Sequence, residues 1–484
     1  MLNSQFSNLN QLTIVEVLKG LKGKKFSAVE LTQACLDRIK RVDDKVKAFI
    51  TVCTKEALEK AKEADREIKK DSKVFDKKPL MGIPFSMKDV YCTKGIETTA
   101  GSKILESYIP QYNATVYQKL LDVGGILIGK TNCDAWGHGV STENSDYFTT
   151  HNPWNLEFVA GGSSGGCGAA LASDMTLFSI GEDTGGSIRL PSSFCSTSGL
   201  KVTYGRVSRY GAIAYASSLD TVGPMAKTVE DLSLILNIIA GKDQLDATTS
   251  ANQVPDYWKS LTSKVRGLSI GLPREFFGKG IDKEVKRLVL QAVEKLKENG
   301  FRTVEVTIPM LKYAIPVYYL LACSETSSNL GRYDGIRYGH NRNSFGAEAK
   351  RRIMLGTFAL SAGYYDQCYL KAQKARTLVI QDYKKAFREC DCIVAPVSPK
   401  PPFKIGEKAD DPLAMYLEDI YTATINTAGI PSLALPCGFS QKGLPIGMQI
   451  IGPQFSEELL FKVGHFYQER TEYHKRKPKV LLHE

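Results

Sequence analysis

The chain has 484 residues, of which 43% are hydrophobic and 24% are charged. This is the composition of an ordinary globular protein, and it excludes a mainly disordered or fibrous chain. The length also exceeds that of a minimal binding module. Lysine and arginine number 63 against 52 acidic residues, a net charge of +11. That charge would attract acidic partners, RNA included, but over so large a surface it equally suits a mildly basic enzyme.

The distribution of cysteine and histidine bears on the compartment and on metals. Eleven cysteines lie between Cys35 and Cys437 without a recurring spacing, which favours reduced thiols over a disulfide framework. The six histidines form no H-x-x-x-H, and no C-x-x-C occurs, so we expect no metal site. The first eleven residues lack the features of a signal peptide, and no run of about 18 apolar residues occurs. We therefore expect a cytoplasmic protein, or an organellar matrix protein if the source is eukaryotic.

In chain order, the first segment, about 1–75, is predicted to be helical. Thr13 with Glu16 and Ser27 with Glu30 have capping-box spacing ahead of apolar periodicity. The second of these predicted helices repeats apolar residues every four positions. The charged stretch from Lys55 to Lys78 predicts a solvated helix and loop.

From Pro79 onward, short apolar runs alternate with helical patterns. Such alternation favours an α/β fold with helices on the faces of a sheet. Because strand-like segments return after a long helical excursion, we expect one domain over 1–484, with a core of about 79–241 and 268–470. Residues 242–266 are polar and predict an exposed excursion. The predicted strands are 126–129, 176–181, 268–272, 392–396, 432–436 and 447–451, and the predicted helices are 115–123, 229–239, 283–299, 310–331 and 346–389.

Two motifs match known expressions but are better explained otherwise. Residues 124–131 satisfy the P-loop expression, yet their middle positions are Gly-Ile-Leu-Ile, so a strand occupies the place of the loop. Residues 162–166 satisfy G-x-S-x-G, but no later histidine lies in a distinctive motif that would complete a triad. Neither expression by itself predicts a site.

Small residues gather at 161–166 and again at 183–187. They form either two flexible turns or a concavity of backbone amides, because glycine lets the backbone approach a ligand closely. A serine hydroxyl beside such donors is what acyl transfer requires. Lys88 follows an apolar run, and a lysine there either reaches toward water or, once desolvated, serves as a general base to serine.

Together, Lys88, GGSSGG at 161–166 and DTGGSIRLPSSFC at 183–195 resemble the amidase signature family. The resemblance implies a mixed central β-sheet covered on both faces by α-helices, the amidase-signature fold. It also implies that Ser187 is the nucleophile, that Ser163, preceded by a cis peptide bond, relays its proton, and that Lys88 is a neutral general base. The backbone amides around Thr184, Gly185 and Gly186 would form the oxyanion hole.

Further blocks are similar to a narrower group of that family, the A subunits of the glutamyl-tRNA(Gln) or aspartyl-tRNA(Asn) amidotransferases; they are 141–155, 199–211, 332–339, 351–366 and 415–438. This resemblance implies hydrolysis of glutamine, held by Arg352 and Asp419, to supply ammonia for misacylated tRNA. It implies a heterotrimer with the amidotransferase B and C subunits, no cofactor or metal in this chain, and ATP with Mg²⁺ at the B subunit. Which tRNA is served would depend on those partners.

Two departures and two alternatives accompany this resemblance. The group usually reads close to NMDEFAMGS where this chain has NCDAWGHGV at 132–140, a segment that in the family borders the substrate pocket, and Cys167 replaces a serine that is common there. The first alternative is a stand-alone amidase that hydrolyses another small amide. The second is a basic RNA-binding protein, which is supported by the net charge of +11 and by the basic tail at 474–479.

Overall fold

The computed structural model describes residues 8–71, 73–263, 265, 267–333, 335 and 339–479. Four positions of the block at 332–339, namely 334 and 336–338, lie outside the described residues, as do two positions of the predicted excursion, 264 and 266. Within the described ranges, no helix combines the length and apolar character needed to cross a membrane.

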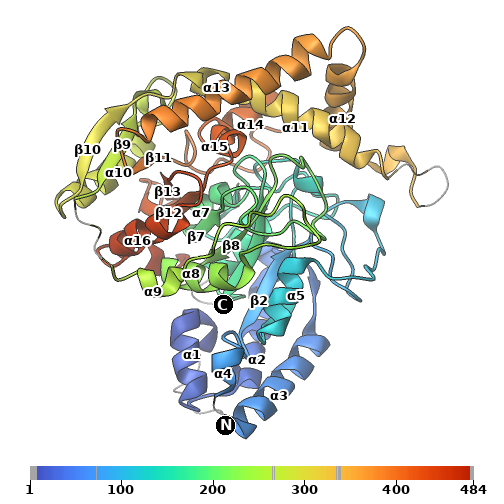
Figure 1. Ribbon diagram of the computed structural model, residues 1–484. Helices are drawn as coiled ribbons and strands as arrows, with labels where there is room; N and C mark the ends of the chain where they lie inside the picture. The colour runs from blue at the N-terminus through green and yellow to red at the C-terminus, as the bar shows by residue number, and fades with distance from the viewer. Residues whose placement is uncertain are drawn as a thin grey trace.

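An eleven-stranded mixed sheet forms the centre of the molecule (Figure 1), in the order β1-β3-β2-β6-β8-β7-β12-β13-β11-β9-β10. Strand β2 runs parallel to both β3 and β6, whereas β6 and β8 are antiparallel. Strands β4 and β5 form a separate hairpin. The strands are β1 Phe49–Val52, β2 Pro84–Lys88, β3 Ile126–Thr131, β4 His151–Asn152, β5 Asn155–Val159, β6 Phe178–Asp183, β7 Ser198–Lys201, β8 Thr221–Ala226, β9 Ser269–Pro273, β10 Arg302–Val306, β11 Cys392–Pro396, β12 Ser432–Phe439 and β13 Pro445–Ile451.

Helices cover both faces of this sheet, because successive side chains of a strand point to opposite faces. In β12, Ala434 packs with Leu190 and Phe194 of α7, whereas Leu433 and its second neighbour Leu435 face Gly464 of α16. The helices are α1 Ile14–Lys22, α2 Ala28–Val46, α3 Thr54–Lys70, α4 Val74–Lys77, α5 Thr115–Asp122, α6 Gly165–Ala172, α7 Arg189–Cys195, α8 Val229–Ile239, α9 Tyr257–Ser260, α10 Lys283–Lys297, α11 Ala314–Leu330, α12 Ala347–Leu360, α13 Lys371–Ala386, α14 Pro412–Tyr416, α15 Ala423–Ala428 and α16 Glu457–Gln468.

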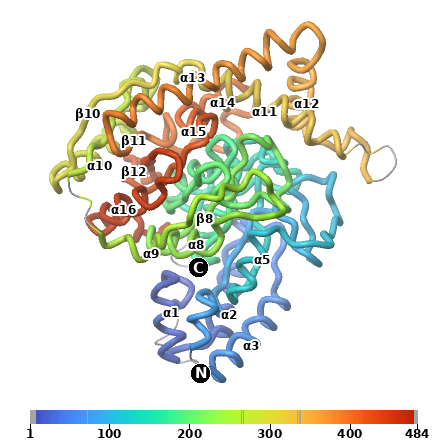
Figure 2. The backbone as a smooth tube through the Cα atoms, in the orientation of Figure 1, coloured from blue at the N-terminus to red at the C-terminus, as the bar shows by residue number. Residues whose placement is uncertain are grey.

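The two groups of helices at the ends of the molecule lie far apart. Helices α1–α3 form one end, and α11–α13 lie across the opposite end (Figures 1 and 2). Both predicted capping boxes are present: the side chains of Thr13 and Ser27 each accept a bond from the backbone N–H of Glu16 and Glu30, respectively. The expected helical segment 1–75 also contains β1, which pairs antiparallel with β3 and so ties the segment to the sheet.

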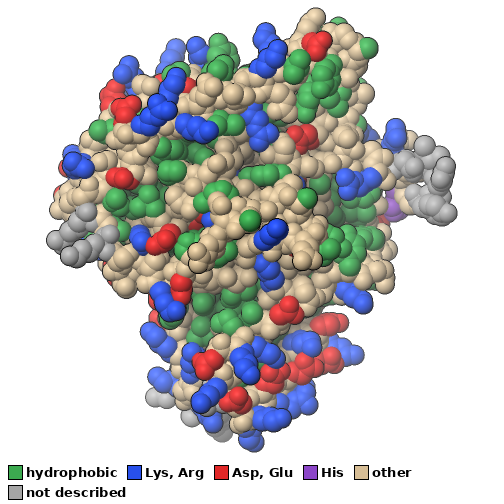
Figure 3. All heavy atoms as spheres, viewed as in Figure 1, with side chains coloured by type: hydrophobic (Ala, Val, Ile, Leu, Met, Phe, Trp, Pro, Cys, Tyr) green, Lys and Arg blue, Asp and Glu red, His purple; other side chains and the backbone are tan. Residues whose placement is uncertain are grey.

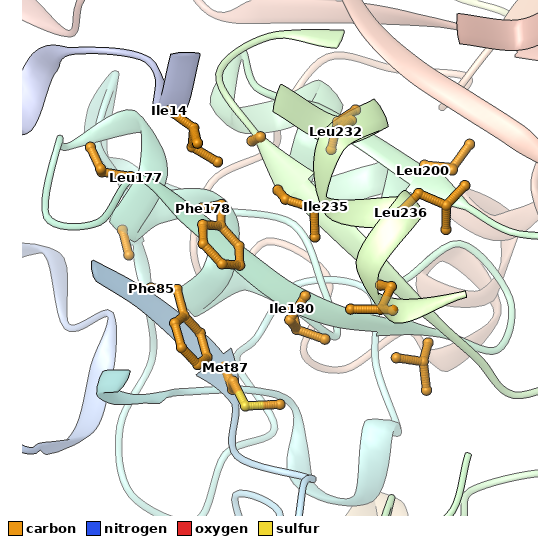
Figure 4. Close-up of a cluster of buried hydrophobic side chains, with 14 of the residues drawn as sticks. Ile14, Phe85, Met87, Leu177, Phe178, Ile180, Leu200, Leu232, Ile235 and Leu236 are labelled. Atoms are coloured by element: carbon orange, nitrogen blue, oxygen red, sulfur yellow. The ribbon is translucent and has the colours of Figure 1, made fainter. Parts of the chain in front are cut away.

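The core beneath the site is apolar and densely packed (Figure 4). Phe85 of β2 stacks on Phe178 of β6, with ring centroids 5.1 Å apart. Ile180, also of β6, and Ile235 of α8 belong to the same buried cluster. Since burying one such side chain contributes roughly 1.5–3 kcal/mol, this cluster fixes β2 and β6 firmly against each other.

Two predicted segments differ from the structure. The helical pattern at 346–389 is divided, because α12 ends at Leu360 and a turn leads into a short π-helix, Asp366–Leu370, before α13. The stretch 242–266 is largely exposed, but it is fastened to the core: Tyr257 of α9 is fully buried and packs edge-on against Phe461 of α16.

Within residues 124–131, β3 occupies the place where a P-loop would need its loop, as the sequence predicted.

Candidate active site

The parallel pairing of β2 with β6 brings the two motif-bearing segments to one edge of the sheet. Lys88 is the last residue of β2, and β6 ends at Asp183, directly before the Thr-Gly-Gly-Ser turn. The carboxyl ends of parallel strands share an edge, and ligands of α/β proteins bind there. The topology therefore places Lys88 beside the loop that carries Ser187.

Lys88 and Ser163 are in direct contact. The Lys88 ammonium, which is fully buried, donates a hydrogen bond of 2.7 Å to Ser163 Oγ. The Gly162–Ser163 peptide bond is cis, as the family resemblance implied. Gly162 allows no side chain, because a Cβ would lie 2.2 Å from Asp134 Oδ2 and 2.6 Å from the backbone nitrogen of Ser141. The glycine is thus what lets the chain bring Ser163 to the amine.

Glu182 is a further charged neighbour of Lys88, and sequence reasoning missed it. Its Oε2 lies 2.9 Å from Lys88 Nζ, and both side chains are nearly inaccessible to solvent. Burial on its own would lower the pKa of Lys88, but the Glu182 carboxylate more than offsets it, so the pKa of Lys88 is raised. The ion pair of 2.9 Å and the raised pKa both favour the ammonium form of Lys88, whereas the family resemblance implied a neutral amine. The available signal was a carboxylate inside the buried strand FSIGED.

The Ser187 loop presents a hydroxyl and a row of backbone donors. Ser187 is 6% exposed, and among the hydrogen bonds of the described residues none uses its hydroxyl. The backbone N–H of Ser164 donates to the Ser187 carbonyl at 3.2 Å, which joins the two serine loops. The N–H groups of Gly185, Gly186 and Ser187 are likewise uncommitted within the described part of the chain. Such donors can stabilise a developing oxyanion.

The base of this loop is held by a buried ion pair. Arg189 of α7 contacts both oxygens of Asp183, at 3.0 and 3.1 Å, and also donates to Asn426 of α15. Asp183 Oδ2 in turn accepts the backbone N–H of Ile188 at 3.1 Å. Burial disfavours the Asp183 carboxylate, but Arg189 holds the pKa of Asp183 below its ordinary value. The loop conformation is therefore fixed before any ligand arrives.

Arg352, predicted to bind a substrate carboxylate, is buried and not a surface cation. Its Nε contacts Glu348 Oε1 at 2.8 Å, and a guanidinium nitrogen donates to the Tyr215 hydroxyl. The guanidinium lies over the rings of Tyr319 and Tyr416, 5.1 and 5.4 Å from their centroids. It borders a cavity of about 300 Å³ that is also lined by Gly139, Asn144 and Tyr416. The arrangement offers a rigid cation to a small anion.

Asp419, predicted to bind a substrate ammonium, lies next to the Ser187 loop. Its Oδ1 is 3.3 Å from the point where a Cβ on Gly186 would be. Its Oδ2 accepts a hydrogen bond of 2.9 Å from the hydroxyl of Tyr319, the residue whose ring lies beneath Arg352. Burial raises the pKa of Asp419 to about 8, against the opposing effects of Tyr319 and Arg352. The tyrosines that join the two predicted binding residues were not foreseen.

The segment 132–140 lies against the same cluster. A Cβ on Gly137 would be 3.4 Å from Glu182 Oε2 and 3.6 Å from Ser163 Oγ. His138 is buried, with its Nε2 3.0 Å from Thr326 Oγ1 and its ring edge-on to Tyr215. Burial keeps the pKa of His138 well below its ordinary value, so this side chain is neutral. The Trp136 ring packs on the rings of Tyr333 and Phe345.

The thiols near the site have the environment of packing residues. All eleven cysteines are free, and Cys167 and Cys195 are buried, with burial raising the pKa of both thiols. Cys167 Sγ lies 3.1 Å from Thr131 Oγ1. No group of three or more potential metal ligands occurs within the residues that the structure describes.

Comparison with known proteins places this geometry in a family. The family model described as Amidase matches residues 30–461. The chain belongs to the amidase family. The expected amidase-signature fold, a mixed α/β sheet flanked by helices, is thereby confirmed, as is the expectation of an enzyme.

Relatives named as amidotransferase subunits match this amidase over almost its full length. The A subunit of the glutamyl-tRNA(Gln) amidotransferase of Desulfatibacillum aliphaticivorans is 48% identical over 487 residues, which covers 98% of this chain and 100% of the relative. The subunit of the same name from a Sulfurihydrogenibium species is 49% identical and covers 95% of this chain and 97% of the relative. The crystal structure of that subunit from Thermotoga maritima superposes with a TM-score of 0.81 at 39% identity, covering 97% of this chain and 96% of the other.

Proposed function

We propose that this chain hydrolyses glutamine and supplies the ammonia to partner subunits that amidate Glu-tRNA(Gln), Asp-tRNA(Asn) or both. One observation carries the proposal: the hydrogen bond of 2.7 Å between Lys88 and Ser163 adjoins a loop with an uncommitted serine hydroxyl, and Asp419 lies beside the same loop. The full-length identity with chains named as such subunits supports the same role.

The recognition step uses the two buried charges. The guanidinium of Arg352 would bind the α-carboxylate of glutamine, and Asp419 would bind its α-ammonium group. Both charges are held in place by tyrosines before substrate arrives, Arg352 through ring contacts and Asp419 through the Tyr319 hydroxyl. Preorganised charges lose less side-chain entropy when they bind a ligand. Glutamine so held presents its carboxamide to Ser187.

The chemical step is an acyl transfer. Ser187 Oγ would attack the carboxamide carbon as its proton passes to Ser163 Oγ and the Ser163 proton passes to Lys88, and the backbone amides near Thr184, Gly185 and Gly186 would stabilise the charge that develops on oxygen. As this intermediate collapses, a proton returns along the same path to the leaving nitrogen, the carbon–nitrogen bond breaks, ammonia departs and a glutamyl ester remains on Ser187. Water then hydrolyses the ester, with the proton path run in reverse.

The partners would be the B and C subunits of a heterotrimer, with ATP and Mg²⁺ bound at the B subunit. An exposed apolar surface supports assembly: Met354, Leu355 and Phe358 of α12 are 71, 47 and 51% exposed. Hydrophobic side chains gather over the end of the molecule where α12 and α13 meet (Figure 3). Contiguous exposed apolar side chains are typical of protein interaction sites.

A basic RNA-binding role for this chain alone has less support. Of the cationic tail at 474–479, Lys477 contacts Asp174 at 2.5 Å, and Arg476 lies over the ring of Phe439. Lys475 is 3.0 Å from Glu472. These cations are therefore partly committed within the protein, and fewer remain for phosphate contacts.

The test compares two nitrogen donors in the complex that co-purifies with this chain. We expect wild type to release ammonia from glutamine and to amidate misacylated tRNA with either glutamine or ammonium chloride. Ser187→Ala should lose the glutamine-dependent reaction and keep the ammonium-dependent one, whereas Ser263→Ala, at an exposed serine outside the site, should keep both. Unchanged ammonia release by Ser187→Ala would overturn the mechanism. Hydrolysis of simple amides without any transfer to tRNA would favour the stand-alone amidase.

A further inference from the structure

The charged state of Lys88 leaves the proton relay without an acceptor. Its ammonium nitrogen lies 2.7 Å from Ser163 Oγ, 2.9 Å from Glu182 Oε2 and 3.5 Å from the Glu182 carbonyl oxygen. A protonated amine has no lone pair, so it cannot take the Ser163 proton unless one of its own protons leaves first. Because Lys88 is fully buried, that proton must go to a group already in contact with it.

We propose that Glu182 is the terminal proton acceptor of the relay, receiving a proton from Lys88 as Ser187 is deprotonated through Ser163. This inference rests on the proposed hydrolysis at Ser187 and adds to it a group that the family resemblance did not supply. Among the contacts of the described residues, the Glu182 carboxylate is the acidic group that touches Lys88 Nζ.

The step balances in protons and in charge. The Ser187 hydroxyl proton moves to Ser163 Oγ, the Ser163 proton moves to Lys88 Nζ, and one Lys88 proton moves to Glu182 Oε2. The Ser187 oxygen uses its electron pair to bond the carboxamide carbon. Lys88 remains an ammonium, Glu182 becomes a neutral acid, and the negative charge passes to the new oxyanion. When the carbon–nitrogen bond breaks, the Glu182 proton returns along the same path to the leaving nitrogen, which departs as ammonia.

The far side of Glu182 is built for this role. The Thr184 hydroxyl donates to Glu182 Oε1 and also lies 2.7 Å from Asp220 Oδ1. A hydroxyl has one hydrogen, so one of the two bonds needs a proton from a carboxylic acid. Burial, and then the charge of Glu182, raises the pKa of Asp220 to about 8, which puts that proton on Asp220 near neutral pH. Asp220 then donates to Thr184, Thr184 donates to Glu182, and Oε2 is left to face Lys88.

Among the described residues, no hydrogen bond or ion pair joins the other nearby titratable side chains to Lys88 Nζ. Burial raises the pKa of the thiols of Cys133 and Cys167 and of the phenol of Tyr91, and it lowers that of His138. Asp134, whose pKa burial raises to about 7, accepts the backbone N–H groups of Thr142 and Asn144.

The test measures kcat for ammonia release at saturating glutamine, in the co-purified complex, between about pH 7 and pH 9. Glu182→Gln keeps the size of the side chain and can accept the Lys88 hydrogen bond, but it cannot take a proton. We expect its kcat to fall about 100-fold, within the range for loss of a general base. The residual rate should rise with pH, since it then depends on the neutral fraction of Lys88, while the wild-type rate should show no such rise. Glu182→Asp should restore part of the rate and remove the rise.

The contrary result is equally specific. If Glu182 merely keeps Lys88 charged and idle, Glu182→Gln and Glu182→Asp would both be faster than wild type near neutral pH, and the inference would be wrong. If thermal unfolding shows that the Gln variant does not fold, the Asp variant decides alone: a kcat below that of wild type supports the inference, and a kcat above it contradicts the inference. Absence of glutamine hydrolysis by wild type would refute the proposed function instead, and the same rate ratios would then be measured on whichever small amide it hydrolyses.

Discussion

Removal of one hydroxyl, by Tyr319→Phe, tests how the site holds an ammonium group. The hydroxyl donates to Asp419 Oδ2 at 2.9 Å, and Asp419 is only 5% exposed, so water cannot fully replace the lost bond. A hydrogen bond to a charged group contributes about 1.5–3 kcal/mol, which corresponds to roughly 10- to 150-fold in binding. We expect kcat/KM for glutamine to fall by a factor in that range. The Tyr319 ring remains, 4.0 Å from that of Tyr416.

The pH dependence gives the sign of the effect. With the pKa of Asp419 at about 8, the carboxylate that binds the ammonium group is present above that pH and is lost as the pH falls through it. The wild-type kcat/KM should therefore rise with pH toward about 8, and Tyr319→Phe should move this rise to higher pH because the carboxylate has lost a donor. Steady-state ammonia release across this range measures both quantities. Tyr313→Phe, at a tyrosine that is 47% exposed, is the matched control. A Tyr319→Phe profile that coincides with wild type would refute the reasoning.

The remaining predictions concern the cation, the serine loop and the thiols. Arg352→Lys keeps the charge but loses the planar group stacked on tyrosine rings, so KM for glutamine should rise at least about tenfold with a smaller change in kcat. Equal changes in KM and kcat would count against a binding role for Arg352. Gly162→Ala places a Cβ 2.2 Å from a carboxylate oxygen and should lower the free energy of unfolding by about 1–3 kcal/mol, measured by thermal unfolding. The control Gly278→Ala should not lower it, because its Cβ would lie 3.6 Å from the nearest atom, the Glu275 carbonyl oxygen. Brief alkylation of the native protein should modify Cys368 first, the one cysteine that is not buried, without loss of ammonia release; peptide mapping that finds early modification elsewhere, with inactivation, would contradict this.

Local signals made part of the fold predictable from the sequence. The capping boxes at Thr13 and Ser27 depend on residues three positions apart, so the sequence contains the whole interaction. The strand at 392–396 was predicted from one apolar run, and its bounds are confirmed. By contrast β8, with the sequence TVGPMA, contains glycine and proline and has weak strand propensity; its antiparallel pairing with β6 determines it. Tertiary pairing of this kind leaves no local pattern.

The site shows the same division. Lys88, Ser163 and Ser187 lie in motifs that resemble a family, and the structure brings the first two into contact. The aromatic groups around Arg352 could not be predicted from the sequence, because Tyr319 and Tyr416 lie in segments that are brought together only by the fold. Glu182 could have been suspected as a charge within a buried strand, yet its effect on the pKa of Lys88 depends on a distance across two strands.

The most direct test of the proposed chemistry is covalent. Wild-type complex would be mixed with glutamine, quenched in acid during turnover, digested, and examined by mass spectrometry for a glutamyl adduct on the peptide that spans residues 183–195. The proposed mechanism predicts an ester on Ser187 that forms within the first turnover and is absent from Ser187→Ala. An adduct on another residue, or hydrolysis that proceeds at the wild-type rate with Ser187 replaced, would contradict it.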